Sequence, residues 1–160
     1  MRAILLETIL SVYRLDPAGI HGVSHWARVE AFGLRLADET GADPLVVSLF
    51  ALFHDACRVS EGHDPRHGPR GALLANRLLR NFPISDIQMN QLLRACELHT
   101  YGTPRTLQDI TILTCWDADR LDLGRVGVTP DPRQLCTEPA KSEEIIAWAV
   151  AKSEAGWNPF

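Results

Sequence analysis

The apolar residues of this chain recur at intervals of three and four positions over most of its length. That spacing places them on one face of a helix. The pattern predicts helices over about residues 2–14, 22–39, 44–58, 70–81, 86–99, 107–123 and 142–153, separated by a polar loop at 59–69 and an irregular segment at 124–140. No stretch alternates apolar and polar residues as a half-buried strand does. We therefore predict an all-α fold, a bundle of about six to seven helices, in a single domain over residues 1–160.

Composition narrows the class of protein. A chain of 160 residues with 46% hydrophobic residues fits one domain with a full core. The net charge of −4 argues against strong nucleic-acid binding, which needs a basic face. The longest apolar run is well short of the ~20 residues that span a bilayer, and the first residues lack the features of a signal peptide. Four widely spaced cysteines without a C-x-x-C pair predict buried thiols in a reducing compartment, so we expect a cytoplasmic protein.

Four polar residues interrupt the apolar faces. His54 and Asp55 end the apolar run 45–53, His25 lies early in the second predicted helix, and Asp119 lies in the sixth. Two imidazoles and two carboxylates suit a divalent ion such as Mn²⁺, Fe²⁺, Ni²⁺, Co²⁺, Zn²⁺ or Mg²⁺. Four ligands leave positions open on an octahedral ion, as a catalytic site requires. The alternative is a buried structural histidine bonded to its neighbouring aspartate.

The order of these residues resembles the HD-domain superfamily of metal-dependent phosphohydrolases. The resemblance rests on three stretches: His25-Trp26-Ala27-Arg28-Val29, His54-Asp55, and Ala118-Asp119-Arg120-Leu121. It covers about residues 20–125, which would be the metal-binding core, and leaves a C-terminal loop and helix at about 126–160. It implies an all-helical fold with His25, His54, Asp55 and Asp119 as metal ligands.

Two further histidines extend the resemblance. His67 and His99 look like the extra histidines of HD proteins that hold a second metal or bind the substrate phosphate. In a site with two ions, Asp55 would bridge them. Only one histidine stands at position 99, where some relatives carry a pair, and the Gly-Tyr-Pro signature of the cyclic-dinucleotide branch is absent. The count of ions, one or two, therefore stays open, and each of these histidines could instead cap a helix end.

Arginines and carboxylates near the predicted ligands supply the remaining candidates. Six arginines are candidates for binding phosphate: Arg28, Arg58, Arg66, Arg70, Arg105 and Arg120. Of these, Arg28, Arg58 and Arg70, with His67 and His99, are predicted to bind substrate, although a surface ion pair is the default for any single arginine. Asp117 and Asp122 flank Asp119, and either one would orient a ligand, pair with an arginine or remain solvated. His21 is interpreted as a loop or cap residue, and His63 as a solvent-exposed one.

The resemblance implies a metal-dependent phosphohydrolase, a phosphomonoesterase or phosphodiesterase, in which Asp55 orients or deprotonates a water molecule. We expect a nucleotide or another small phosphorylated molecule as the substrate. An HD-type di-iron oxygenase and a noncatalytic nucleotide- or metal-binding module are the alternatives. The last predicted helix is apolar enough to pack on the core or on a second copy of the chain, which would give a homodimer.

Overall fold

The computed structural model describes residues 2–159, and every regular element in that range is helical. The α-helices are α1 (Arg2–Leu10), α2 (Val23–Thr40), α3 (Pro44–Phe53), α4 (His67–Leu78), α5 (Asp86–Leu98), α6 (Ile110–Leu121) and α7 (Glu143–Glu154). Three 3₁₀ helices lie between α6 and α7: η1 (Asp122–Val126), η2 (Pro132–Gln134) and η3 (Pro139–Lys141). The predicted all-α class is confirmed. In residues 2–159 no helix has the length and apolar character needed to cross a membrane.

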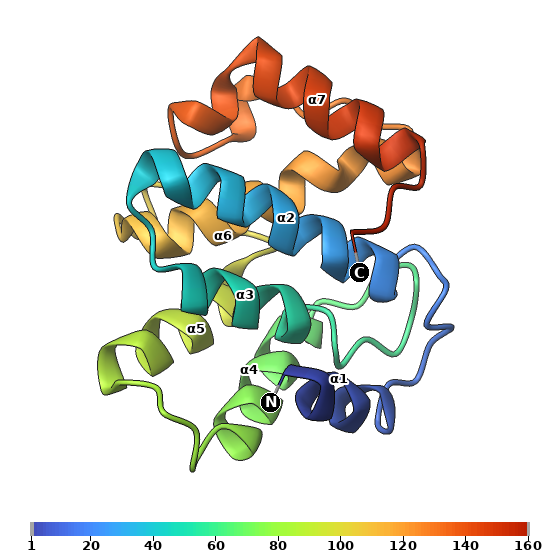
Figure 1. Ribbon diagram of the computed structural model, residues 1–160, viewed down its shortest axis with the longest axis vertical. Helices are drawn as coiled ribbons and strands as arrows, with labels where there is room; N and C mark the ends of the chain where they lie inside the picture. Colours follow the sequence, from blue (N-terminus) through green and yellow to red (C-terminus); the bar gives the residue numbers. More distant parts are fainter. Residues whose placement is uncertain (1, 160) are drawn as a thin grey trace.

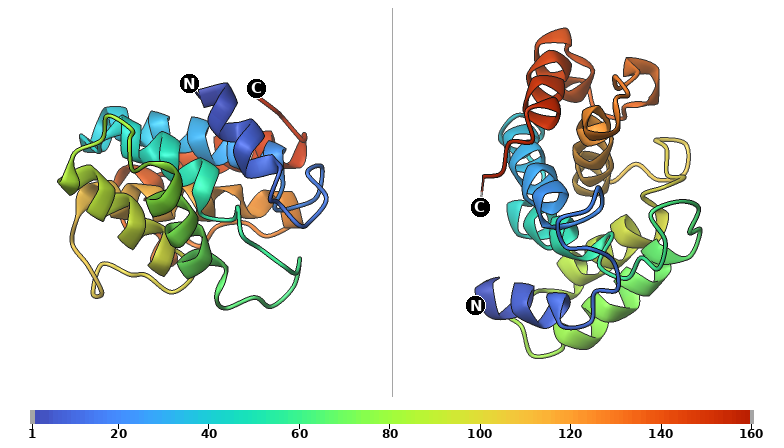
Figure 2. Two further views of the ribbon diagram at one scale, coloured as in Figure 1. Left: turned by 90° about the horizontal axis from the view of Figure 1, so that it is seen from below. Right: turned by 90° about the vertical axis from the view of Figure 1, so that its right-hand side faces the viewer.

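The centre of the molecule is built from α2, α3 and α6 (Figure 1). The α2 helix packs against both α3 and α6, and α5 packs against α3 and α6 from the other side. The α4 and α5 helices pack on each other. Figure 2 shows α1 and α4 at one end of the molecule and α7 at the opposite end. The α2, α3 and α6 helices are thus covered by other helices at both ends of the molecule, and polar residues such as His25 and His54 are buried in its interior.

Two hydrophobic clusters hold this arrangement together. The larger one joins α2, α3, α5 and α6 around fully buried Trp26, Phe50 and Trp116. The smaller one lies beneath α7, where Ile145, Ile146 and Ala149 pack on Phe32 and Leu36 of α2. The apolar face of the last helix is therefore covered by its own chain.

Helix starts follow local sequence signals. Asp43 caps α3 by accepting hydrogen bonds from the backbone N–H groups of Leu45 and Val46, and Pro44 occupies the first helical position. Ser85 and Gln88 form a capping box at the start of α5. The predicted helix starts at residues 44 and 86 are therefore confirmed.

Three helices end at least three residues earlier than predicted, among them α4, which ends at Leu78 instead of about residue 81. The α1 helix stops at Leu10 instead of about residue 14, and α3 stops at Phe53 instead of about residue 58. The reason at α3 is tertiary: α4 crosses its end so closely that a Cβ at Gly71 would collide with the Phe53 carbonyl oxygen. His54 and Asp55 consequently lie just beyond the helix, on a turn.

Two helix starts also differ from the prediction. The α4 helix begins at His67, inside the predicted loop 59–69, because Gly68 and Pro69 are tolerated in a first helical turn. The α6 helix begins at Ile110, three residues later than predicted, where Asp109 caps it through the N–H groups of Thr111 and Ile112. The start of α4 matters for the site, since it makes His67 the first residue of a helix.

Candidate metal centre

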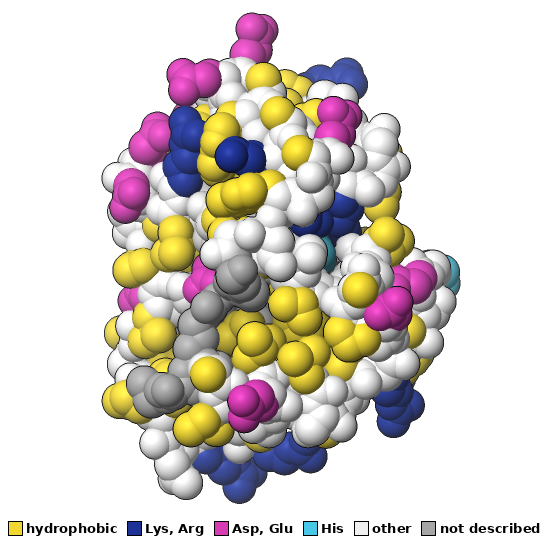
Figure 3. All heavy atoms as spheres, turned by 45° about the vertical axis from the view of Figure 1, so that its right-hand side comes forward, with side chains coloured by type: hydrophobic (Ala, Val, Ile, Leu, Met, Phe, Trp, Pro, Cys, Tyr) yellow, Lys and Arg dark blue, Asp and Glu magenta, His cyan; other side chains and the backbone are white. Residues whose placement is uncertain are grey.

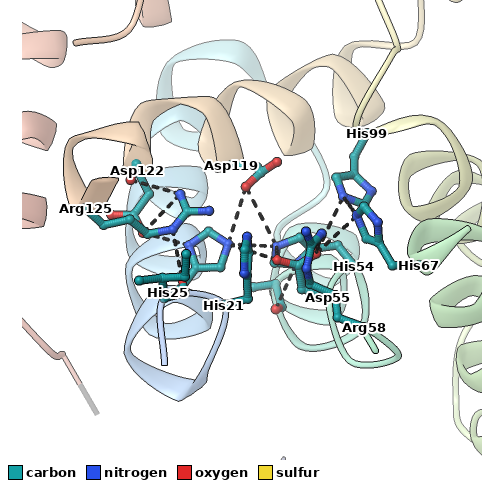
Figure 4. Close-up of polar contacts among 12 residues, drawn as sticks. His21, His25, His54, Asp55, Arg58, His67, His99, Asp119, Asp122 and Arg125 are labelled. Atoms are coloured by element: carbon teal, nitrogen blue, oxygen red, sulfur yellow. Dashed lines mark hydrogen bonds and ion pairs between the residues drawn. The ribbon is translucent and has the colours of Figure 1, made fainter. Parts of the chain in front are cut away.

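The first group of candidate ligands consists of His25, His54 and Asp119 and is called group A here. His25 comes from α2, His54 follows α3, and Asp119 comes from α6 (Figure 4). The Nε2 atoms of the two histidines lie 3.0 Å apart. Asp119 Oδ1 lies 3.4 Å from His25 Nε2 and 3.8 Å from His54 Nε2. Both histidines are fully buried.

The second group, group B, consists of Asp55, His67 and His99. His67 opens α4, and His99 directly follows α5. Their Nε2 atoms lie 2.8 Å apart. Gly68 makes this approach feasible, since a Cβ there would collide with the Cys96 carbonyl oxygen and lie 3.2 Å from the His99 ring. The structure therefore brings both extra histidines into the same centre as the four predicted ligands.

Asp55 connects the two groups. Its Oδ2 lies 3.6 Å from the Nε2 atoms of both His25 and His54. Its Oδ1 lies 3.2 Å from His67 Nε2 and 3.8 Å from His99 Nε2. One carboxylate oxygen thus faces each group, so Asp55 could contribute a ligand atom to both.

Every histidine of the centre is oriented through its Nδ1 atom. His25 Nδ1 lies 2.7 Å from Asp122 Oδ2, His99 Nδ1 lies 2.8 Å from the Cys96 carbonyl oxygen, and His54 Nδ1 lies 3.1 Å from two carbonyl oxygens of α3. His67 Nδ1 contacts the Asp64 carbonyl oxygen. Carbonyl and carboxylate oxygens only accept, so Nδ1 carries the proton and the lone pair of Nε2 points into the centre.

These lone pairs fit a cation. When both imidazoles are neutral, two Nε2 atoms that face each other have no proton to share, so they repel unless a positive charge lies between them. Two nitrogens bound at about 2.1 Å to neighbouring positions of an octahedral ion lie about 3.0 Å from each other. The separations within groups A and B, 3.0 Å and 2.8 Å, match that value. The residues present therefore fit divalent metal ions.

The charge states of His54 and Asp55 favour metal binding. At His25, by contrast, burial would lower the pKa, but contacts with Asp119 and Asp122 outweigh burial and raise the pKa, so a bound ion competes with a proton there. Burial lowers the pKa of His54 to about 3, which keeps this imidazole neutral at neutral pH. Burial alone would raise the pKa of Asp55, but the positive charge that His54, His25 and His99 carry when protonated holds it well below its usual value. Deprotonated carboxylates and neutral imidazoles are the forms that bind metal.

Asp122 orients His25 of group A through the Nδ1 atom, on the opposite side of the ring from Nε2. It is fully buried and accepts hydrogen bonds from His25 Nδ1 and Ser153 Oγ as well as from Arg28, whose Nε lies 2.6 Å from Oδ1. Of the two flanking carboxylates that the sequence left open, Asp122 is therefore the one that orients a ligand. Asp117 instead accepts hydrogen bonds from the backbone N–H groups of Cys136 and Thr137 and fixes the segment before η3.

An open cavity of about 360 Å³ lies over the centre and contains Asp55, Asp119, His67 and His99 in its wall. Its remaining wall carries one acidic side chain, Asp64, the phenol of Tyr101, and the basic side chains His21, Arg58, His63, Arg120 and Arg125. A hollow with a histidine and basic side chains beside it is visible in Figure 3. His21, interpreted from the sequence as a loop or cap residue, contacts Glu61 and lines this cavity.

The three arginines predicted to bind substrate have different surroundings. Arg58 lines the cavity and donates to Asp55 Oδ1 and the Gly62 carbonyl oxygen, at 3.3 and 3.1 Å. Arg28 is buried against Asp122 and donates to the Trp157 carbonyl oxygen, so it faces away from the cavity.

Arg70 binds Asp64 and the Cys57 carbonyl oxygen and lines a separate groove. Neither Arg28 nor Arg70 is placed to contact a molecule at the metal centre. Arg125, which sequence reasoning missed, does reach the cavity. The sequence did hold a signal for this placement, since Arg125 lies three residues after Asp122 and so falls on the same side of the chain as that aspartate.

All four cysteines are free thiols. Cys96 and Cys115 are buried, as predicted, whereas Cys57 and Cys136 are only partly buried. None of them belongs to the two groups of candidate ligands.

Comparison with known proteins gives one match. A family model described as HD domain matches residues 22–149, most of the chain and more than the stretch on which the sequence resemblance rests. No curated protein and no solved structure matches the chain. The matched region contains all six residues of groups A and B. The chain therefore belongs to the HD domain family.

Proposed function

We propose that this protein is a metal-dependent phosphohydrolase that cleaves a phosphate ester of a small molecule and uses two divalent ions. The observation that carries the proposal is the position of Asp55, whose two carboxylate oxygens face two separate groups of ligands. Paired ions about 3.5–4 Å apart are a recurrent arrangement in enzymes that cleave phosphate esters. Membership of the HD family supports the same class of reaction.

The donor set restricts the choice of ion. Groups A and B together offer four imidazole nitrogens and two carboxylates. Mg²⁺ prefers oxygen ligands, whereas imidazole suits Mn²⁺, Fe²⁺, Co²⁺, Ni²⁺ and Zn²⁺. We therefore infer that the ions belong to the first-row transition series.

The side chains divide into distinct roles. When bound, the ions supply Lewis acidity and lower the pKa of a water molecule. Asp55 would contribute one carboxylate oxygen to each group and would orient that water. Asp119 is the more exposed of the two ligand carboxylates, with 20% of its side chain accessible against 4% for Asp55, so a water in the cavity reaches it directly.

Cationic side chains in the cavity wall favour an anionic substrate. Arg58, Arg120 and Arg125 all border the cavity. Arg120 donates to the carbonyl oxygens of Gln134 and Gly102, which orient its guanidinium without neutralising it. Guanidinium groups stabilise the charge on phosphate oxygens. The volume of about 360 Å³ lies near the lower end of small-molecule sites, which favours a compact phosphorylated metabolite or a mononucleotide.

A hydrolysis assay tests this proposal. Protein loaded with Mn²⁺ or Co²⁺ is offered p-nitrophenyl phosphate, bis(p-nitrophenyl) phosphate and a panel of nucleoside monophosphates, and the released product is measured. We expect hydrolysis that falls at least about 100-fold in Asp55→Asn, the size of effect seen when electrostatic stabilisation of a transition state is lost. Asp38→Asn, the same chemical change at an exposed position of α2, serves as the control.

Two results would contradict the proposal. Iron-loaded protein that consumes O₂ and releases no phosphate would favour the oxygenase alternative, since the same ligands suit iron. Protein that binds metal but hydrolyses nothing on the panel and consumes no O₂ would favour a noncatalytic module.

A further inference from the structure

A second cavity lies between the end of α1, the loop after α3 and the outer face of α4. Its volume is about 410 Å³, and it is lined by Val12, Arg14, Cys57, Val59, Arg70, Leu73, Leu74 and Arg77. None of these residues lines the cavity over the metal centre. The volume lies within the range of about 300–1,000 Å³ for small-molecule sites. We call it the arginine groove.

The arginine groove has apolar walls that are open to water. Leu73 is 70% exposed, Val59 is 49% exposed, and Val12 is 45% exposed. Figure 3 shows hydrophobic side chains gathered on the half of the molecule where α1 lies, with Lys or Arg side chains bordering them at the lower edge. Apolar area of this kind contributes to binding when a ligand removes it from water.

The charges of the groove are all positive, and two of them are unpaired. Its lining includes three arginines and no acidic residue. Arg14 and Arg77 are exposed and have no hydrogen bond or ion pair with any residue in 2–159. Arg70 is held by Asp64 and by the Cys57 carbonyl oxygen, at 2.6 and 3.0 Å.

The three arginines line the same groove as Cys57. A single anionic group in this groove therefore has three guanidinium groups in the surrounding wall. Because guanidinium groups bind carboxylate, sulfonate or phosphate oxygens as forks, such a group has ready donors.

The geometry points to a binding site in the arginine groove for a small amphiphilic anion. Its anionic head lies between Arg14, Arg70 and Arg77, and its hydrocarbon or aromatic body covers Val12, Val59 and Leu73. The ligand is a soluble molecule, since the groove is about the size of a small-molecule site. This site does not depend on the reaction at the metal centre.

Isothermal titration calorimetry with octane-1-sulfonate tests the site on the metal-loaded protein. The sulfonate has an anionic head and an apolar chain but no ester bond, so a phosphohydrolase cannot consume it. We expect one molecule to bind per chain. Methanesulfonate, which lacks the chain, and octanol, which lacks the charge, should each bind at least about tenfold more weakly, because each loses one of the two contributions.

Matched variants locate the binding. Arg14→Gln combined with Arg77→Gln should weaken octanesulfonate binding at least about tenfold, the loss expected for charge-assisted hydrogen bonds. Arg80→Gln, an exposed arginine that lies outside the groove, and Arg58→Gln in the metal cavity should leave it unchanged. Equal binding by the double variant and the wild type would overturn the proposal, as would loss of binding in Arg58→Gln alone.

Cys57 provides a local readout that does not depend on mutation. It lines the groove, and Cys136, the other partly buried cysteine, does not. Bound octanesulfonate should slow the alkylation of Cys57 by iodoacetamide and leave the rate at Cys136 unchanged. Equal rates at Cys57 with and without ligand would contradict the site. Binding to phosphatidylglycerol vesicles without any binding of octanesulfonate would overturn the soluble ligand in favour of a membrane surface.

Discussion

Asp122 Oδ2 lies 2.7 Å from His25 Nδ1, and this buried contact fixes the direction in which the His25 lone pair points. The same carboxylate receives Arg28 from α2 and Ser153 from α7. The last helix of the chain is thus tied to the metal centre through a single aspartate. Carboxylates that hold a metal-binding imidazole in place strengthen metal binding without touching the ion.

Asp122→Asn tests this relationship. The amide cannot accept hydrogen bonds from His25, Arg28 and Ser153 as the carboxylate does, so we expect the affinity of group A for metal to fall about 10- to 100-fold. The buried Arg28 also loses its charged partner, which should lower the free energy of unfolding by about 3–5 kcal/mol.

A metal titration and a urea unfolding curve measure the two effects of Asp122→Asn. Ser153→Ala removes one donor to Asp122 and keeps the His25 contact, so it should retain metal affinity close to wild type. An unchanged affinity in Asp122→Asn would show that the contact does not support the site.

Metal removal should destabilise the fold. The six ligands come from α2, α4, α6 and the residues that follow α3 and α5, so bound ions tie separate elements together. A ligand that binds only the native state adds about 4.1 kcal/mol at 1,000 times its Kd. We expect a chelator to lower Tm by several degrees and added Mn²⁺ to restore it. The Tm of Asp55→Ala should respond far less, and an equal response would contradict the bridging role.

Gly68→Ala should damage group B selectively. The new methyl group would collide with the Cys96 carbonyl oxygen and press on the His99 ring, so α4 and α5 must move apart. Overpacking of this kind costs about 1–3 kcal/mol. We expect one ion to be lost per chain while group A keeps its own.

Gly62→Ala is the control for Gly68→Ala, since the nearest atom to its new Cβ is Ser60 Oγ at 3.6 Å. It should bind metal like the wild type. Retention of both ions in Gly68→Ala, measured as metal per chain, would refute the close approach of the two helices.

Arg58 and Arg28 should respond differently to the same change. Arg58→Gln removes a cation from the wall of the metal cavity, and we expect a rise in KM of about tenfold, in line with the loss of a charge-assisted hydrogen bond. Arg28→Gln instead leaves Asp122 without its buried partner and should act mainly on stability. Steady-state kinetics and urea unfolding separate these outcomes. Arg105→Gln, an exposed arginine outside the cavity, should change neither.

Much of this architecture could be predicted from local patterns. The apolar periodicity located all the long helices, and the pairing of His54 with Asp55 after an apolar run pointed to the metal centre. The end of α3 was predicted too late because it depends on the crossing of α4 at Gly71, which has no local signal. Spacing along a helix showed that Asp122 shares a face with Asp119, but not which donors would meet it there.

Arg28 and Arg70 also show that spacing along a helix does not determine which partner a side chain contacts. Arg28 lies three residues after His25 and shares its face, yet His25 Nε2 faces Asp119 whereas the Arg28 guanidinium is held by Asp122. Arg70 follows His67 by three residues but points into the arginine groove. Spacing predicts the face of a helix on which a side chain lies, whereas its partner depends on the neighbouring element.

The most direct test of the two-ion centre is elemental analysis of the purified protein, reported as moles of metal per chain. Wild type, Asp55→Ala and Asp38→Asn are compared after loading with Mn²⁺ or Co²⁺, with circular dichroism to verify that each is folded. The bridging position of Asp55 predicts about two ions per chain in the wild type and in Asp38→Asn, and less than one in Asp55→Ala. No metal in the loaded wild type, or two ions retained in Asp55→Ala, would contradict it.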